Sequence, residues 1–353
     1  MADMTDTTAP VTITAIPEVT PAHADAWRQV VTASLAEDLP GVPPPTPSQA
    51  YARLSRPGLG SRLLTWLAYA TDGDGRTRPV GAATLRLFDR QGQEHLAETD
   101  LHVHPDARRR GIGTALLSAV VAEVRSEGRR SLIAETPASG TADLFCVRHG
   151  FRRALTLHHL LLSLTEAHHD RLVELTGTDR PGYRTVAWHG TVPDALADTF
   201  AAAKNAMNDM PTGDLDYGTL SWDAERVRAM AAVVAGRGDT LLTVAAVHGA
   251  ESDDGTAEIA GFTEIVIPDG TATRARQYDT AVVPAHRGHG LGVWLKAHML
   301  RQLHAKYPQV TEVETDNAAD NAHMLAVNEQ LGFRHQRTTH EYRLALAEGE
   351  GSA

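Results

Sequence analysis

The sequence lacks the features that mark secreted, membrane-spanning or cysteine-ligated metal proteins. Its 353 residues contain one cysteine, Cys146, which excludes an intramolecular disulfide and a zinc site built from several cysteines. No apolar run approaches the roughly 18 residues that a transmembrane helix needs. The segment 1–6 is acidic and polar, unlike the basic and apolar start of a signal peptide. These absences favour a cytoplasmic protein with no membrane partner.

Excess positive charge is missing as well. Lys and Arg number 33 and Asp and Glu number 44, which gives a formal net charge of −11. An acidic surface disfavours nucleic acid as the main partner, and it weakly favours cationic small molecules through electrostatic steering. The basic triplet Arg108–Arg110 has no interleaved aromatic residues of the kind that stack on bases. We therefore expect no nucleic-acid partner.

What the sequence does contain is an internal repeat. Segments 100–113 and 279–292 share Asp, Val, Pro, Gly and Gly at a constant offset of 179, as in 279 − 100. A second landmark, Gly150-Phe151, recurs as Gly332-Phe333 with an offset of 182, from 332 − 150. At about 150 residues per domain the length also suggests two domains. The chain therefore reads as a tandem duplication.

Hydrophobic periodicity predicts the same order of elements in both copies. Each copy combines hairpin-like strand pairs with a strand–helix–strand unit, so we expect α/β (α+β) domains with mixed sheets. The expected domains cover residues 10–165 and 183–347, joined by a polar linker. The proline-rich segment 42–47 is expected to be a loop. Strands are expected at 11–16, 63–69, 80–87, 98–103, 131–136 and 158–164, and at 183–188, 241–247, 259–267, 278–283, 310–315 and 341–346.

The shared glycines lie between a strand and an amphipathic helix. A helix N-terminus leaves N–H groups without partners and carries the positive end of the dipole, so it suits a phosphate. Glycine lets the backbone approach the ligand, and Arg108 and Arg287 can add charge-assisted hydrogen bonds. The motif predicts a pyrophosphate site at 111–113 and 290–292. It is neither a P-loop nor a dinucleotide fingerprint, and a plain glycine turn that starts a helix is the alternative.

The whole ordered set is more specific than the glycines alone. Val-x-Pro, Arg-x-x-Gly-x-Gly, a helix, a strand, a second helix and Gly-Phe resemble the GNAT superfamily of acyl-CoA-dependent N-acyltransferases. The set occurs at Val103, Pro105, Arg108, Gly111, Gly113 and Gly150-Phe151, and again at Val282, Pro284, Arg287, Gly290, Gly292 and Gly332-Phe333. Two fused copies are similar to the tandem arrangement of which mycothiol synthase is an example. No residue pattern ties the chain to the substrate of mycothiol synthase.

The resemblance implies acetyl-CoA as cofactor and assigns it a site in each copy. Pantetheine would pair with the strand before the motif, where a backbone N–H can polarise the thioester, and the loop would hold the pyrophosphate. The implied cofactor-binding residues are Val103, Arg108, Arg109, Arg110, Gly111, Ile112 and Gly113 in the first copy, and Val282, Val283, Arg287, Gly288, His289, Gly290, Leu291, Gly292 and Asn321 in the second.

The family often has an Asn eleven residues before the Gly of Gly-Phe and a proton-donating Tyr four before it. The second copy has Asn321 and Asn328 at these positions, whereas the first has Ser139 and Cys146. We therefore expect the second copy to be catalytic. An amide does not supply a proton, so Asn328 can only donate a hydrogen bond, and water is an alternative acid.

Two acidic residues are candidates for the catalytic base. Asp279 and its repeat counterpart Asp100 lie in strand interiors, where Asp is disfavoured. A hydrogen bond to a neighbouring loop or helix is one explanation, and general base catalysis, directly or through water, is the other. Glu264 is the second candidate, and Glu98 is the corresponding candidate base in the first copy.

The combined expectation is an N-acetyltransferase that moves an acetyl group from acetyl-CoA directly to a primary amine of a small molecule. The alternative is a catalytically inactive acyl-CoA-binding sensor or partner module. No metal site is expected, because the pair His102 and His104 has no supporting ligand pattern. The sequence does not identify the acceptor amine. It also leaves open whether the chain forms a homodimer, as such domains often do.

Overall fold

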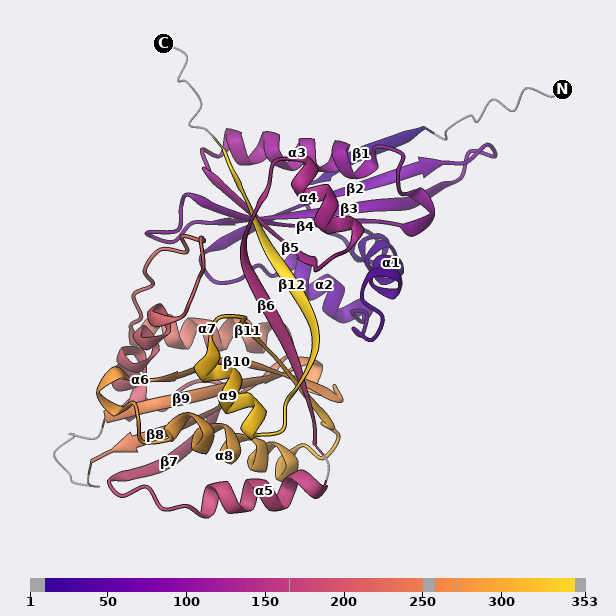
Figure 1. Ribbon diagram of the computed structural model, residues 1–353. Coiled ribbons are helices and arrows are strands. Elements are labelled where there is room, and N and C mark those ends of the chain that lie inside the picture. The colour runs from indigo at the N-terminus through magenta and orange to yellow at the C-terminus, as the bar shows by residue number, and fades with distance from the viewer. Residues whose placement is uncertain (1–9, 165, 250–257, 271, 347–353) are drawn as a thin grey trace, which may run out of the picture. The chain divides into compact units, whose positions relative to one another are not determined.

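The computed structural model describes residues 10–164, 166–249, 258–270 and 272–346. The chain divides into two compact units, one running up to Arg153 and taking in the segment from Glu341, the other comprising Ala154–His340 (Figure 1). In the described part of the chain, no helix combines the length and apolarity required to cross a membrane. The polar N-terminal segment 1–6 lies outside the described residues.

Unit 1 contains a sheet in the order β1-β2-β3-β4-β5, followed by the end of β12. Strands β4 and β5 are parallel, and the pairs β1–β2, β2–β3 and β3–β4 are antiparallel. Its elements are β1 (Val11–Ile16), α1 (Pro21–Asp38), α2 (Pro47–Ser55), β2 (Ser61–Thr71), β3 (Thr77–Phe88), β4 (Leu96–Val103), α3 (Ile112–Ser126), β5 (Ser131–Pro137), α4 (Thr141–Arg148) and the end of β12 (Arg334–Ala345).

Unit 2 repeats this plan, with its strands in the order β12-β6-β11-β10-β9-β8-β7. Strands β10 and β11 form the parallel pair that corresponds to β4 and β5. Its elements are β6 (Arg152–Ser163), α5 (Glu166–Gly177), β7 (Tyr183–His189), α6 (Ala197–Lys204), α7 (Ala224–Gly236), β8 (Thr240–His248), β9 (Glu258–Ile267), β10 (Arg274–Val282), α8 (Leu291–Lys306), β11 (Glu312–Ala318) and α9 (Ala322–Gln330). The expected α/β class with mixed sheets is confirmed.

The last strand of each repeat belongs with the other copy. Strand β6 ends the first repeat in sequence, yet it pairs antiparallel with β11 inside unit 2, from Glu312 opposite Ser163 to Ala318 opposite Leu157. The end of β12 closes the second repeat but lies in unit 1, where the Arg343 Nε donates to the Ser131 Oγ at 2.9 Å. The compact units therefore divide the chain differently from the repeats 10–165 and 183–347.

Alternating side chains place helices on both faces of each sheet. On β8, Leu242, Val244 and Ala246 are buried in the core that α8 covers. The intervening Ala245 and Val247 are buried in the core that α6 covers. This is the period of two expected for a strand, and each fully buried Val or Leu side chain stabilises the fold by about 1.5–3 kcal/mol.

The proline-rich segment predicted as a loop is free of helix over 42–46, and helix α2 begins at its last residue, Pro47. Thr46 and Gln49 form a reciprocal capping box, and the proline occupies the first turn, where its missing N–H costs nothing. Helix α5 occupies most of the expected linker between 165 and 183, and its Leu172 is 2% exposed in the core of unit 2. Polar composition concealed a helix that buries one face.

Candidate active site

In both units the strand before the glycine motif parts from its parallel neighbour. The β10–β11 pairing covers Arg274–Arg276, whereas β10 continues to Val282 paired with β9 on its other edge. In unit 1 the β4–β5 pairing covers Leu96–Thr99, whereas β4 continues to Val103. Each unit thus presents a stretch of strand edge beyond the parallel ladder. Such an edge suits an extended ligand that adds main-chain hydrogen bonds.

The glycine loops have one backbone geometry. Gly111 and Gly290 are the N-caps of α3 and α8 in the left-handed region, with φ of 79° and 68°. Two residues earlier, Arg109 and Gly288 also have positive φ, 64° and 84°. Among the described residues no side chain caps either helix. The first N–H groups therefore form a concave donor surface that suits a pyrophosphate in both units.

The motif arginines connect each loop to the preceding strand. The Nε of Arg108 donates to the carbonyl of Val103 at 3.2 Å, and its guanidinium pairs with Asp38 of α1. The Nε of Arg287 donates to the carbonyl of Val282 at 3.1 Å, and an Nη pairs at 2.6 Å with Asp209, which ends a 3₁₀ helix. These arginines shape the loop, and a carboxylate already shares each charge. Sequence reasoning missed both aspartates because they come from distant helices.

Arg180 adds a second cation beside the unit 2 loop. Its Nη2 lies 3.3 Å from the point that a Cβ on Gly290 would occupy, so a side chain at 290 would crowd it. The Nε of Arg180 is buried and has no hydrogen-bond partner among the described residues. Sequence reasoning placed this arginine in a linker and missed it.

The two candidate bases meet on a buried lysine that the sequence did not single out. The Nζ of Lys204 donates to the Glu264 Oε2 at 2.6 Å and to the Asp279 Oδ2 at 2.8 Å. The same ammonium lies 4.7 Å from the ring centroid of Trp222 and 5.0 Å from that of Phe262. Ion pairing and cation–π contact together compensate for the desolvation of this charge.

Burial and neighbouring charges shift the pKa values of Lys204 and Glu264. Burial alone would lower the pKa of Lys204, but Glu264 and Asp279 outweigh it and raise the pKa, so the ammonium stays charged. Burial raises the pKa of Glu264 and the charge of Asp279 adds to this, against the opposing effect of Lys204. The Glu264 side chain is 8% exposed and that of Asp279 is 36% exposed. Asp279 is therefore the carboxylate that a ligand can reach.

A β-bulge sets the position of Asp279. The register between β9 and β10 shifts between Gln277 and Thr280, so Asp279 lies in the irregular step of the ladder. Bulges commonly re-aim a side chain next to a functional site. In unit 1, Asp100 pairs in regular register with Thr84. The repeat counterparts therefore differ in local backbone as well as in partners.

Asp100 in unit 1 is held by two basic side chains. Its carboxylate accepts from the Arg53 Nη2 at 2.8 Å and contacts the His102 Nε2 at 2.8 Å. Burial alone would raise the pKa of Asp100, but His102 and Arg53 hold that pKa well below its usual range. Glu98 pairs with Arg86 at 3.2 Å, and burial raises the pKa of Glu98. Neither carboxylate shares a lysine as in unit 2.

The two asparagines of the second copy are engaged inside the protein. The Oδ1 of Asn321 accepts from the Met324 N–H at 3.1 Å and caps α9. Asn328 is fully buried, accepts from the Lys296 Nζ at 2.6 Å and donates to the Asn317 Oδ1 at 2.6 Å. Asn328 thus has internal partners at both its amide oxygen and its amide nitrogen, and its role as a hydrogen-bond donor to the thiol stays a prediction.

Lys296 is a second buried lysine of unit 2, and it contacts the Asn328 amide and the Phe333 ring. Its side chain is 1% exposed, and burial lowers its pKa to about 7. The repeat counterparts of Lys296 and Asn328 are Leu117, from 296 − 179, and Cys146, from 328 − 182. Burial raises the pKa of the Cys146 thiol to about 12, which fits a packing residue and not a nucleophile.

The space beside the helix glycines also differs between the units. A Cβ on Gly113 would meet the Phe145 ring at 3.4 Å and the Val103 Cγ2 at 3.6 Å. A Cβ on Gly292 would meet only the Val327 Cγ2, at 3.9 Å. Phe145 and Val327 are repeat counterparts, from 327 − 182. The space beside the helix glycine is thus filled by an aromatic ring in unit 1, whereas a smaller side chain leaves that space more open in unit 2.

The family follows from a comparison with known proteins. The model of the acetyltransferase (GNAT) family matches residues 32–151 and 218–333, which is more than half of the chain and falls on both copies. The chain belongs to this family. The sequence-based identification of a tandem GNAT protein is thereby confirmed, and acetyl transfer is the activity that the family supports.

Individual relatives agree with this assignment. A mycothiol acetyltransferase of Clavibacter michiganensis subsp. michiganensis is 29% identical over 299 residues, covering 81% of both chains. Among solved structures, a tandem GNAT protein from the clavulanic acid biosynthesis pathway is 27% identical, with a TM-score of 0.76 over 95% of this chain and 98% of that one. A GCN5-related N-acetyltransferase from Sphaerobacter thermophilus, 18% identical with a TM-score of 0.63 over 96% and 97% of the two chains, shares the fold.

Proposed function

We propose that unit 2 transfers an acetyl group from acetyl-CoA to a primary amine of a small molecule, with Asp279 as the residue that receives the amine proton. The observation that carries this proposal is the dual role of β10. One strand supplies both the edge beyond the β10–β11 pairing and the exposed carboxylate of Asp279, and it leads directly into the glycine loop. A donor site and an acceptor site on one strand can bring the two substrates into register.

Acetyl-CoA fits the groups that this unit offers. The uncapped N-terminus of α8, the glycine loop and Arg180 provide donors and positive charge for a pyrophosphate. Pantetheine would pair with the edge of β10 near Val282. The Val282 carbonyl already accepts from the Arg287 Nε, and the Val283 N–H already donates to the Ala260 carbonyl, so neither of these two groups is open to it. When bound, acetyl-CoA supplies the acetyl group as a thioester. Arg287 holds the loop against the strand through the Val282 carbonyl.

The acidic cluster has a defined task in this scheme. Asp279, the more exposed carboxylate of the cluster, attracts an acceptor ammonium, whereas burial raises the pKa of Glu264. The acceptor ammonium first loses one proton to solvent water, because only the neutral amine carries the lone pair that attacks. Asp279 then takes the second proton from that nitrogen as it forms its bond to the acyl carbon and the C–S bond breaks. Water supplies the proton to the departing thiolate. Glu264 positions Lys204, and Lys204 positions Asp279.

Two relatives support a small-molecule acceptor. One is a mycothiol acetyltransferase, and the other comes from the clavulanic acid biosynthesis pathway. The partly exposed carboxylate of Asp279 favours an acceptor that arrives as a cation. A sensor without transfer activity is the rival, because no tyrosine occupies position 146 or 328.

The test is turnover of acetyl-CoA with a panel of small primary amines, read by release of free thiol. The proposal predicts amine-dependent release that Asp279→Asn abolishes while acetyl-CoA binding persists. Binding of acetyl-CoA with no release for any amine would favour the sensor. Equal turnover in Asp279→Asn would overturn the assignment of the base.

A further inference from the structure

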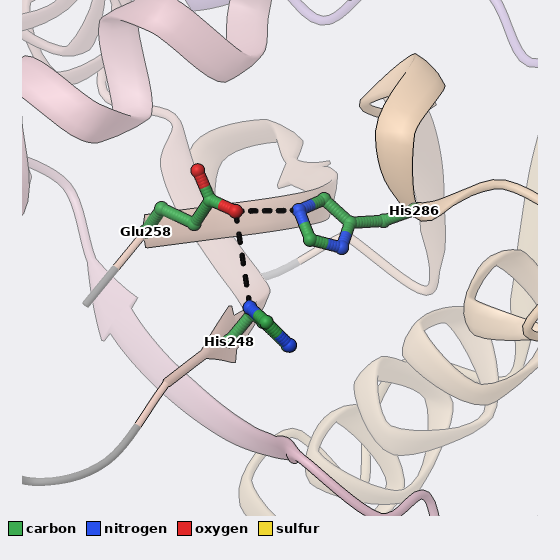
Figure 2. Close-up of side chains that lie close together, drawn as sticks. All are labelled: His248, Glu258 and His286. Carbon is green, nitrogen blue, oxygen red and sulfur yellow. Dashed lines mark hydrogen bonds and ion pairs between the residues drawn. The ribbon is translucent and has the colours of Figure 1, made fainter. Parts of the chain in front are cut away.

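Three side chains from separate elements of unit 2 converge outside the acidic cluster. His248 ends β8, Glu258 begins β9, and His286 ends the short 3₁₀ helix Pro284–His286 before the glycine loop (Figure 2). One ligand atom of each lies within 4.8 Å of the other two. The Glu258 Oε1 lies 2.7 Å from the His286 Nε2 and 3.8 Å from the His248 Nδ1.

We propose that His248, Glu258 and His286 form a binding site for a divalent transition metal, with Zn²⁺ as the best match. Two imidazoles and one carboxylate are a donor set that Zn²⁺ accepts, with water as a fourth ligand. Zn²⁺ bonds of about 2.0–2.2 Å in tetrahedral geometry place ligand atoms roughly 3.3 Å apart. The observed separations lie on both sides of that value. Small rotations of the exposed His248 and Glu258 side chains would equalise them.

The third ligand is held in place by a neighbouring tyrosine. His286 is 9% exposed, and its Nδ1 lies 3.0 Å from the Tyr183 Oη. A metal on Nε2 requires the other ring nitrogen to carry the proton, so Nδ1–H would donate to Tyr183. Ligating histidines typically have such a partner, which fixes the tautomer and the ring orientation. Tyr183 also lies 5.0 Å from the His248 ring, centroid to centroid.

A metal here would crosslink the start of the glycine loop to the sheet. His286 immediately precedes Arg287, whereas His248 and Glu258 close the facing ends of β8 and β9. Binding to the folded state alone raises stability by mass action. The site therefore has a structural role that does not depend on the proposed acetyl transfer.

The test is calorimetric titration of Zn²⁺ into the chelator-treated full chain, with Mg²⁺ as a negative control. We expect one Zn²⁺ per chain and a rise of a few degrees in the thermal midpoint. Glu258→Gln, which keeps a hydrogen-bond acceptor, should weaken binding about tenfold or more, and Tyr183→Phe should weaken it about tenfold. Substituted Co²⁺ should show the visible absorption of a four-coordinate site.

The matched control is His335→Gln. His335 is exposed and has a ring neighbour, His158, at 5.0 Å between ring centroids, but it belongs to no three-ligand group among the described residues. The proposal holds if Zn²⁺ affinity survives this change and falls in the Glu258 and His248→Gln variants. It is overturned if Zn²⁺ does not bind, or if His335→Gln lowers the affinity as much as Glu258→Gln.

Discussion

The two units build the same glycine loop but surround the strand aspartate differently. Asp100 lies in a regular ladder and is bound by Arg53 and His102, whereas Asp279 lies in a bulge and shares the buried Lys204 with Glu264. The loop backbone, its left-handed positions and the arginine tether are common to both. The two copies thus share the geometry of the glycine loop, while the residues next to it diverged. Their differences point to unit 2 as the catalytic unit.

The largest expected difference between the units lies in the carboxylates. Asp279→Asn should lower turnover by about 100-fold or more, the usual contribution of a general base, and leave acetyl-CoA affinity unchanged. Steady-state rates with the best amine of the panel measure this. Asp100→Asn is the matched control and should leave turnover within about twofold of wild type. A larger loss in Asp100→Asn would move catalysis to unit 1.

The arginine tethers offer the next contrast. Arg287→Glu should weaken acetyl-CoA binding about tenfold, because it places a second carboxylate beside Asp209 next to the proposed pyrophosphate site. Arg108→Glu should leave that affinity unchanged. It should instead lower the free energy of unfolding by about 2 kcal/mol, since it faces Asp38 with a like charge. Calorimetry and denaturant unfolding separate the two effects, and equal losses of affinity would remove the asymmetry.

Exchanging the residues beside the helix glycines gives a smaller effect. Val327→Phe should weaken acetyl-CoA binding about fivefold, because it introduces into unit 2 the ring that Phe145 places beside Gly113 in unit 1. The reciprocal Phe145→Val should leave affinity and turnover near wild type. Thermal unfolding of both variants checks that each still folds. An unchanged affinity in Val327→Phe would show that this space is not used.

The smallest effect concerns Lys296. Its folded pKa of about 7 lies below the ordinary 10.5, so between these values the unfolded chain binds a proton that the folded chain does not. The free energy of unfolding therefore rises with pH over that window. Lys296→Leu with Asn328→Cys, which copies Leu117 and Cys146 of unit 1, should flatten this rise and increase the thermal midpoint at pH 7. An unchanged slope between pH 7 and 10 would contradict the assignment.

Much of the fold was predictable because it rests on local patterns. Alternation gave the strands, and the position of Gly111 and Gly290 between a strand and an apolar stripe predicted where α3 and α8 begin. The exchange of β6 and β12 was not predictable. Their sequences specify a strand but not its partner, since register depends on side chains that come together only in the folded chain.

The site was predicted in part. Asp279 and Glu264 were singled out because acidic residues are disfavoured in strand interiors, and the structure brings both onto Lys204; their catalytic role stays a prediction. Lys204 was missed, because a lysine at the end of a helix ordinarily lies in solvent. The proposed metal ligands His248, Glu258 and His286 were not singled out either, since they are spread over 39 positions, counted from 248 to 286, without any ligand spacing.

The most direct test of the central claim is calorimetric titration of acetyl-CoA into the cofactor-free full chain, read for stoichiometry in wild type, Arg287→Glu and Arg108→Glu. Unit 2 as the working site predicts one acetyl-CoA per chain, with affinity that falls in Arg287→Glu and persists in Arg108→Glu. Two equivalent sites, or a single site weakened by Arg108→Glu alone, would contradict it.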